Sequence, residues 1–240
     1  MKIGILQTGA VRPKLAATHG EYPAMFEDLL GEAAPTLRFE AHAVVDGAPV
    51  PAPEAADGWV ITGSRHGVYD DLPWIAPLKA MLREARAAAV PVIGICFGHQ
   101  LLAEAFGGRA IKHPGGWRVG LTEFAVTAPA GWRDAVDHMT LHSLHQDQVV
   151  AIPDDATAWA SGTDCRYAAL SYGDPECPDA ISIQPHPEFR PDFARALIAH
   201  LDEEGRFPGD LGRTALAGLD AGAVDNARVG AWLARYLRLK

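Results

Sequence analysis

The chain has 240 residues, 48% of them hydrophobic, which is enough to build the core of one large α/β domain. Its formal net charge of -9 argues against a phosphate-binding surface, so we expect no nucleic-acid partner. The three cysteines, Cys96, Cys165 and Cys177, are odd in number and far apart, so we expect a reducing, cytoplasmic compartment rather than a disulfide framework.

The first half of the chain alternates short apolar runs with helical patterns. Strands are predicted at residues 2–7, 37–45, 58–61 and 90–95, and helices at 22–33, 73–88 and, from Gln100, 100–106. This alternation predicts a mostly parallel sheet that helices cover on both faces. No apolar run is long enough to span a bilayer and residues 1–6 lack the features of a secretory signal, so we expect no membrane association.

The second half of the chain does not continue this alternation of strands and helices. Residues 118–126, 157–160, 167–172 and 180–184 have the pattern of antiparallel strands, which predicts an antiparallel flank on the sheet. A helix is expected at 191–201, and an amphipathic helix at 225–239 with Val229, Trp232, Leu233, Tyr236 and Leu237 on its apolar side. We therefore divide the chain into a domain at 1–204 and a helical extension at 205–240 that packs on it.

The strongest chemical signal is a glycine-flanked cysteine between a buried strand and a helix. In the run Gly94-Ile-Cys96-Phe-Gly98, the small neighbours permit the sharp turn of a nucleophile elbow. That turn places the sulfur of Cys96 at the carboxyl end of the sheet and at a helix amino terminus, which favours thiolate. An isolated cysteine is more often structural, and this interpretation is kept for the other two cysteines.

A cysteine nucleophile needs a base, and His186 is the best placed of the ten histidines. An apolar strand leads directly into it, and Glu188 lies two residues further on, on the same side of an extended segment. Glu188 is therefore predicted to orient the imidazole of His186. The alternative, if Glu188 is considered without its neighbours, is that its carboxylate is exposed to solvent in a loop.

These strings together resemble the class I, triad-type glutamine amidotransferases. The matching segments are Gly-Ile-Cys-Phe-Gly-His-Gln at 94–100, Gln-Pro-His-Pro-Glu-Phe at 184–189 and Ile-Thr-Gly-Ser at 61–64. The resemblance covers residues 1–201 and implies a flavodoxin-like three-layer sandwich, whose central sheet is mostly parallel with an antiparallel flank. It also implies a γ-glutamyl thioester on Cys96, with no metal and no cofactor.

The resemblance further assigns the oxyanion hole and the substrate-binding residues. The backbone amides of Gly63 and Phe97 are expected to form the oxyanion hole. Substrate binding is expected from Gln100 and from a loop at 144–149, within which we name Leu144, His145 and Gln146. Gln146 stands where the glutaminase part of GMP synthetase has glycine, which puts the path of that loop in question. The segments at 68–71 and 115–120 look more like stand-alone members of the family.

Three functions remain open from the sequence. The first is a glutaminase that releases ammonia from glutamine, with a separate synthetase subunit as partner, since the chain has no phosphate-binding loop of its own. The second is a hydrolase of γ-glutamyl amides or peptides, because the chain also resembles plant γ-glutamyl peptidases. The third is a non-catalytic binding or regulatory member of the fold, against which the complete triad counts.

Overall fold

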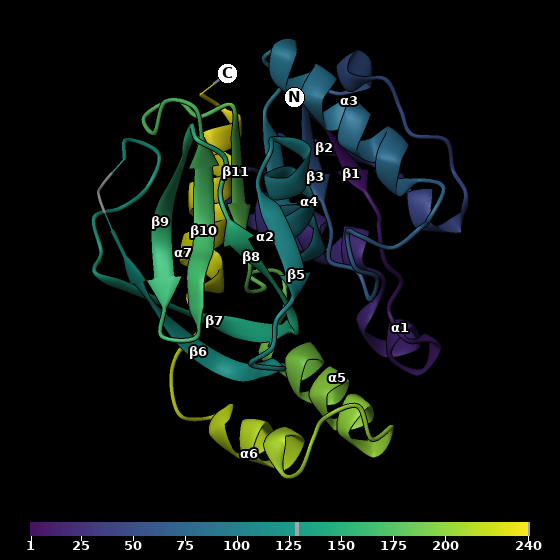
Figure 1. Ribbon diagram of the computed structural model, residues 1–240, viewed down its shortest axis with the longest axis vertical. Coiled ribbons are helices and arrows are strands. Elements are labelled where there is room, and N and C mark those ends of the chain that lie inside the picture. The colour runs from purple at the N-terminus through teal and green to yellow at the C-terminus, as the bar shows by residue number, and fades with distance from the viewer. Residues whose placement is uncertain (128–129, 240) are drawn as a thin grey trace.

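The computed structural model describes residues 1–127 and 130–239, which form a central nine-stranded sheet with helices on both faces (Figure 1). Its strand order is β2-β1-β3-β4-β11-β10-β9-β6-β7. The parallel half consists of β2 (Arg38–His42), β1 (Lys2–Leu6), β3 (Gly58–Ile61), β4 (Val92–Ile95) and β11 (Ala180–Ile183). The antiparallel half consists of β10 (Cys165–Tyr172), β9 (Ala156–Gly162), β6 (Arg118–Val126) and β7 (His138–His145). The predicted mostly parallel sheet with an antiparallel flank is confirmed.

Alternate side chains of the parallel strands point into two separate cores. In β4, Ile93 and Ile95 join the core beneath α2 (Tyr22–Ala33) and α7 (Asn226–Leu237), whereas Val92 joins the core beneath α3 (Ile75–Ala87) and α4 (Phe97–Ala105). A sheet buried on both faces requires the continuous apolar strands that the sequence shows. The predicted three-layer arrangement is therefore confirmed.

The terminal helix α7 is part of the main core. The five apolar side chains predicted for it are all buried, and Trp232 lies edge-on to Trp159 of β9 at 6.2 Å between ring centroids. Tyr236 donates a hydrogen bond from its hydroxyl to the carbonyl oxygen of Asp179 over 2.9 Å. The division of the chain at residue 204 stays a prediction.

A third apolar cluster lies around α1 (Pro13–His19), α5 (Pro191–Glu203) and α6 (Leu211–Gly218). Phe189, in the connection between β11 and α5, and Phe207, between α5 and α6, both belong to it. Figure 1 shows α5 and α6 side by side, next to β6 and β7. This cluster thus brings the segment after α5 to the carboxyl ends of the parallel strands.

Several element boundaries differ from the sequence prediction. Helix α4 begins at Phe97 rather than Gln100, because the turn at Cys96 leads directly into it. The segment after β2 ends in a short 3-10 helix, Val44–Asp46, and β11 pairs in parallel with β4 although its other neighbour is antiparallel. Five elements were not predicted: α1, α6, β7, β5 (Arg109–Lys112) and β8 (Asp147–Ala151), the last two forming a small second sheet.

Candidate active site

Three neighbouring parallel strands end at the same edge of the sheet. Ile61 of β3 is opposite Gly94 of β4, and Ile95 is opposite Ile183 of β11. The residues that follow these strand ends include Gly63, Cys96 and His186. Because the carboxyl ends of parallel strands converge, segments far apart in the sequence meet here, as in other open α/β folds.

The turn at Cys96 has the strained geometry of a nucleophile elbow. Cys96 has a φ of 53° and immediately precedes α4, and its amide donates to the carbonyl oxygen of Ile183 over 2.9 Å. A β-carbon at Gly94 would lie 2.4 Å from the carbonyl oxygen of Gly98, and one at Gly98 would lie 2.7 Å from that of Ile61. Both glycines are therefore needed for the close approach of strand, turn and helix.

His186 is held from three directions. Its Nδ1 donates a hydrogen bond to Oε1 of Glu188 over 2.8 Å, and Glu188 is only 2% exposed. The ring stacks on Phe189, with 3.9 Å between centroids and 10° between planes. The His186 amide donates to the carbonyl oxygen of His142 in β7 over 2.8 Å. The predicted contact between Glu188 and His186 is present, and the stack and the β7 contact add to it.

The surroundings of His186 favour its protonated form. Burial alone lowers the pKa of the imidazole, but the charges of Glu188 and Cys96 outweigh it and raise the pKa. Hydrogen bonding with the Cys96 side chain also raises this pKa, and apart from it the buried Nε2 atom has no partner within residues 1–127 and 130–239. This nitrogen is therefore free to exchange a proton with a group on the Cys96 side of the ring.

Gly63 lies between the cysteine and the histidine. A β-carbon built on it would be 3.1 Å from Cε1 of His186 and 3.7 Å from Cβ of Cys96. Its amide and that of Phe97 donate no hydrogen bond to any residue that the structure describes. Two unpaired backbone donors therefore flank the sulfur, as an oxyanion hole requires.

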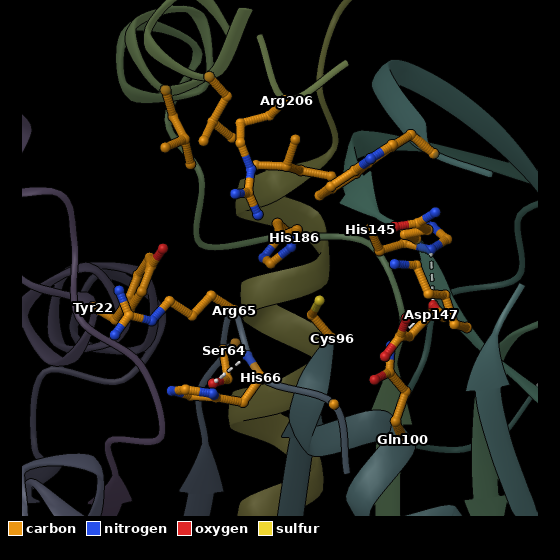
Figure 2. Close-up of a pocket in the computed structure, with 18 of the residues that line it drawn as sticks. Tyr22, Ser64, Arg65, His66, Cys96, Gln100, His145, Asp147, His186 and Arg206 are labelled. Atoms are coloured by element: carbon orange, nitrogen blue, oxygen red, sulfur yellow. Dashed lines mark hydrogen bonds between the residues drawn. The ribbon is translucent and has the colours of Figure 1, made fainter. Parts of the chain in front are cut away.

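These groups form the floor of a cavity of about 310 Å³. Figure 2 shows Cys96 and His186 at its centre, with Gln100, His145 and Asp147 on one side and Tyr22 and Arg65 on the other. Of the predicted site residues, the cavity wall includes Cys96, His186, Gly63, Gln100, Leu144, His145 and Gln146. Glu188 lies behind His186, and the ring of Phe97 packs against Trp74 at 5.5 Å between centroids.

The predicted loop at 144–149 is a junction between two strands. Residue 145 ends β7, residue 147 begins β8, and Gln146 alone lies between them. Nε2 of Gln100 donates to the carbonyl oxygen of Asp147 over 3.0 Å, and Nδ1 of His145 donates to the same oxygen over 3.2 Å. The junction is thereby fixed against α4, so these residues form a rigid wall.

His145 is a neutral part of that wall. Burial, together with the nearby charge of His186, lowers the pKa of its imidazole to about 3. The ring of His145 therefore stays uncharged at neutral pH.

Several cavity residues were missed by the sequence analysis. Tyr22 stacks on the far side of Phe189, with 6.2 Å between ring centroids and 12° between planes, and its buried hydroxyl has a raised pKa because of burial and of Glu188. Arg65, Lys112, Trp117 and Arg206 also line the cavity. Two of them had a local signal: Arg65 follows Gly63 by two residues, and Trp117 lies in the segment 115–120 that resembles stand-alone family members.

Among the described residues, no group of three His, Cys, Asp or Glu side chains is arranged to hold a metal ion. Of the described helices, none combines the length and apolar character that crossing a membrane requires.

The comparison that decides the family is a match to the model of the glutamine amidotransferase class-I family over residues 42–199. The chain belongs to this family. A glutamine amido transferase from Methylobacillus flagellatus has the same fold, with a TM-score of 0.78 and 25% identity over 99% of this chain and 93% of that one. The flavodoxin-like architecture expected from the sequence is thereby confirmed.

Two curated relatives represent the branches of the class-I glutamine amidotransferases that the sequence resembles. Gamma-glutamyl peptidase 4 of Arabidopsis thaliana is 27% identical over 87% of this chain and 84% of its own length. The glutamine-hydrolysing GMP synthase of Streptococcus pneumoniae is 31% identical over 55% of this chain but only 24% of its own length. The chain thus matches the peptidase along most of its length and the synthase over a limited segment.

Proposed function

We propose that this class-I glutamine amidotransferase hydrolyses γ-glutamyl amide bonds through a thioester on Cys96. One observation supports this most directly: Cys96, Gly63 and His186 meet on the floor of one cavity. Glu188 is hydrogen-bonded to Nδ1 of the same imidazole. A nucleophile, a base and an orienting carboxylate in this order form the arrangement that covalent acyl transfer requires.

In the first step, Sγ of Cys96 bonds to the carbonyl carbon of the substrate amide, while Nε2 of His186 holds the proton that the thiol has given up. The amides of Gly63 and Phe97 donate to the oxyanion, each contributing about 3–4 kcal/mol in sites of this kind. The C–N bond then breaks, His186 gives its proton to the leaving nitrogen, and a γ-glutamyl thioester remains. Water, deprotonated by His186, cleaves the thioester and releases glutamate.

We propose that the γ-glutamyl part of the substrate binds to the wall of the cavity next to Cys96. Gln100, Leu144, His145 and Gln146 line the cavity next to Cys96, and Gln100 and His145 are held by the carbonyl oxygen of Asp147. Groups fixed in this way lose little entropy when a substrate binds.

Glutamine is the simplest substrate, and γ-glutamyl peptides are the second candidate. A cavity of about 310 Å³ extends beyond Cys96 to Arg206, and the relative matched over 87% of this chain is a gamma-glutamyl peptidase. A glutaminase serving a separate synthetase subunit is the third reading, prompted by the GMP synthase match. The cytoplasmic location stays a prediction.

The test is mass spectrometry of the intact protein after treatment with a diazoketone analogue of glutamine, followed by peptide mapping. We expect one adduct, on Cys96, that excess glutamine suppresses. An adduct on Cys165 or Cys177, or none, would contradict the proposal. Parallel assays of ammonia release from glutamine and of amino-acid release from γ-glutamyl dipeptides then separate the two substrates.

A further inference from the structure

The outer part of the cavity is positively charged although the whole chain carries a net charge of -9. Arg12, Arg65, Lys112 and Arg206 line it, against the carboxylates of Asp70 and Asp147. Arg12 is paired with Glu204 over 3.0 Å. Arg65 and Arg206 have no ion pair or hydrogen bond from their side chains to any residue in 1–127 or 130–239. Two guanidinium groups are therefore available to a ligand.

Arg206 extends towards the reacting groups from a fixed backbone. Its amide donates to the carbonyl oxygen of Leu201 over 3.0 Å, and the next residue, Phe207, is edge-on to Trp117 at 5.4 Å between centroids. Figure 2 shows the guanidinium of Arg206 directed towards His186, and Arg65 entering from the loop that carries Ser64 and His66. The two arginines therefore approach the cavity from different segments of the chain.

The two carboxylates of the cavity are already engaged. Oδ2 of Asp147 accepts a hydrogen bond from the hydroxyl of Tyr69 over 2.8 Å, and Oδ2 of Asp70 accepts one from the amide of Gly67 over 3.0 Å. Neither of them forms an ion pair with Arg65 or Arg206. Both arginines therefore remain without a direct carboxylate partner among the described residues.

We infer that Arg206, assisted by Arg65, binds a carboxylate on the amine that leaves, so that the preferred substrate is a γ-glutamyl amino acid rather than glutamine. In a γ-glutamyl amino acid this carboxylate is one carbon away from the scissile nitrogen, so it must lie close to His186. A guanidinium forms paired, charge-assisted hydrogen bonds with a carboxylate. The ammonia that leaves glutamine has no such group.

This inference rests on the proposed thioester chemistry and deepens it. The attack by Cys96 and the proton transfers of His186 are unchanged. His186 protonates the nitrogen of the leaving amino acid instead of ammonia, and water then releases glutamate. Arg206 takes no part in proton transfer and acts only as a specificity residue.

The experiment compares kcat/KM for γ-glutamyl-alanine with that for γ-glutamyl-alaninamide, which differ only in the carboxylate. We expect the wild-type protein to prefer the carboxylate by roughly tenfold or more, as a hydrogen bond to a charged group allows. Arg206→Gln should remove most of this preference through a higher KM for γ-glutamyl-alanine, and Arg206→Lys should keep part of it. Arg65→Gln should reduce it less.

The matched control is Arg109→Gln, which removes the same charge from an exposed arginine of β5 outside the cavity and should leave the preference unchanged. Equal rates on both substrates in the wild type, with the diazoketone still bound to Cys96, would overturn this inference and leave the thioester proposal intact. No adduct and no hydrolysis of either substrate would overturn both.

Discussion

The floor and the outer wall of the cavity are built in opposite ways. The floor consists of residues that follow three adjacent parallel strands, and Cys96, His186 and Glu188 are between 2% and 6% exposed. The outer wall carries Arg65, Tyr69 and Arg206, which are exposed and come from loops or connections. Under the proposed function, the sheet fixes the geometry for bond breaking, and loop residues select the leaving group. This division implies that chemistry and selectivity can be altered separately.

Removing the nucleophile should have the largest effect. Cys96→Ser is expected to reduce kcat/KM by about a thousandfold or more, because the serine hydroxyl is a much weaker nucleophile beside the same base. The thermal midpoint should change little. Cys177→Ser is the matched control, since Cys177 is exposed and outside the cavity, and it should retain full activity. Unchanged turnover in Cys96→Ser would show that the nucleophile lies elsewhere.

Weakening the orienting group should have the next largest effect. Glu188→Gln is expected to lower kcat/KM by roughly a hundredfold, less than His186→Ala, because it misdirects the base without deleting it. Since the charge of Glu188 raises the pKa of His186, this variant should also shift the limb of the pH–rate profile that belongs to His186 to lower pH. A loss equal to that of His186→Ala, with no shift of the profile, would indicate a structural role for Glu188.

Crowding the floor should have a smaller effect. In Gly63→Ala, the new β-carbon would lie 3.1 Å from Cε1 of His186, so the imidazole must move by a few tenths of an ångström. We expect kcat/KM to fall by about tenfold, while the preference between γ-glutamyl-alanine and its amide is kept. Gly31→Ala, in helix α2 with open space around it, is the control and should leave activity unchanged. A changed substrate preference in Gly63→Ala would contradict the separation of floor and wall.

The smallest expected effect concerns acid stability. Burial lowers the pKa of both His99 and His145 to about 3, so in the folded protein they stay neutral where unfolded histidine is protonated. Above pH about 6.5 this difference does not reduce the free energy of unfolding. Between pH about 6.5 and about 5, each histidine lowers the free energy of unfolding by about 1.5 kcal/mol. His186, with a raised pKa, stays protonated in the folded protein throughout this window, and it adds little slope because unfolded histidine is mostly protonated below pH about 6.

His99→Gln tests this directly, because glutamine does not titrate. Urea unfolding of this variant between those two pH values should show a loss of stability smaller than that of the wild type by about 1.5 kcal/mol. His138→Gln, at an exposed histidine of β7, should keep the wild-type loss. An unchanged slope in His99→Gln would mean that His99 is not buried as a neutral ring.

The sequence predicted the floor of the cavity better than its outer wall, because the floor depends on local sequence and the outer wall does not. The Cys96 elbow and the contact of His186 with Glu188 depend on neighbouring residues, whose spacing is visible in the chain. The wall depends on contacts between distant segments, such as Arg206 beyond α5. No local sequence pattern predicts these contacts, so the sequence analysis did not distinguish Arg206 from other surface residues.

The same distinction explains the errors in the fold. Strands β1, β3 and β4 are buried on both faces and show as apolar runs. Strand β7 mixes histidines with apolar residues, and it is defined by its pairing with β6 and its bridge to His186, which no local sequence pattern shows. The family resemblance predicted a loop at residues 144–149, yet β8 begins there at Asp147 and pairs with β5.

The positive φ at Cys96 has a cost for folding. A residue with a side chain at a φ of 53° destabilises the folded state by on the order of 1–2 kcal/mol. Glycine at this position would relieve this torsional cost but would remove the sulfur. The proposed nucleophile and the stability of the fold therefore place opposite demands on residue 96.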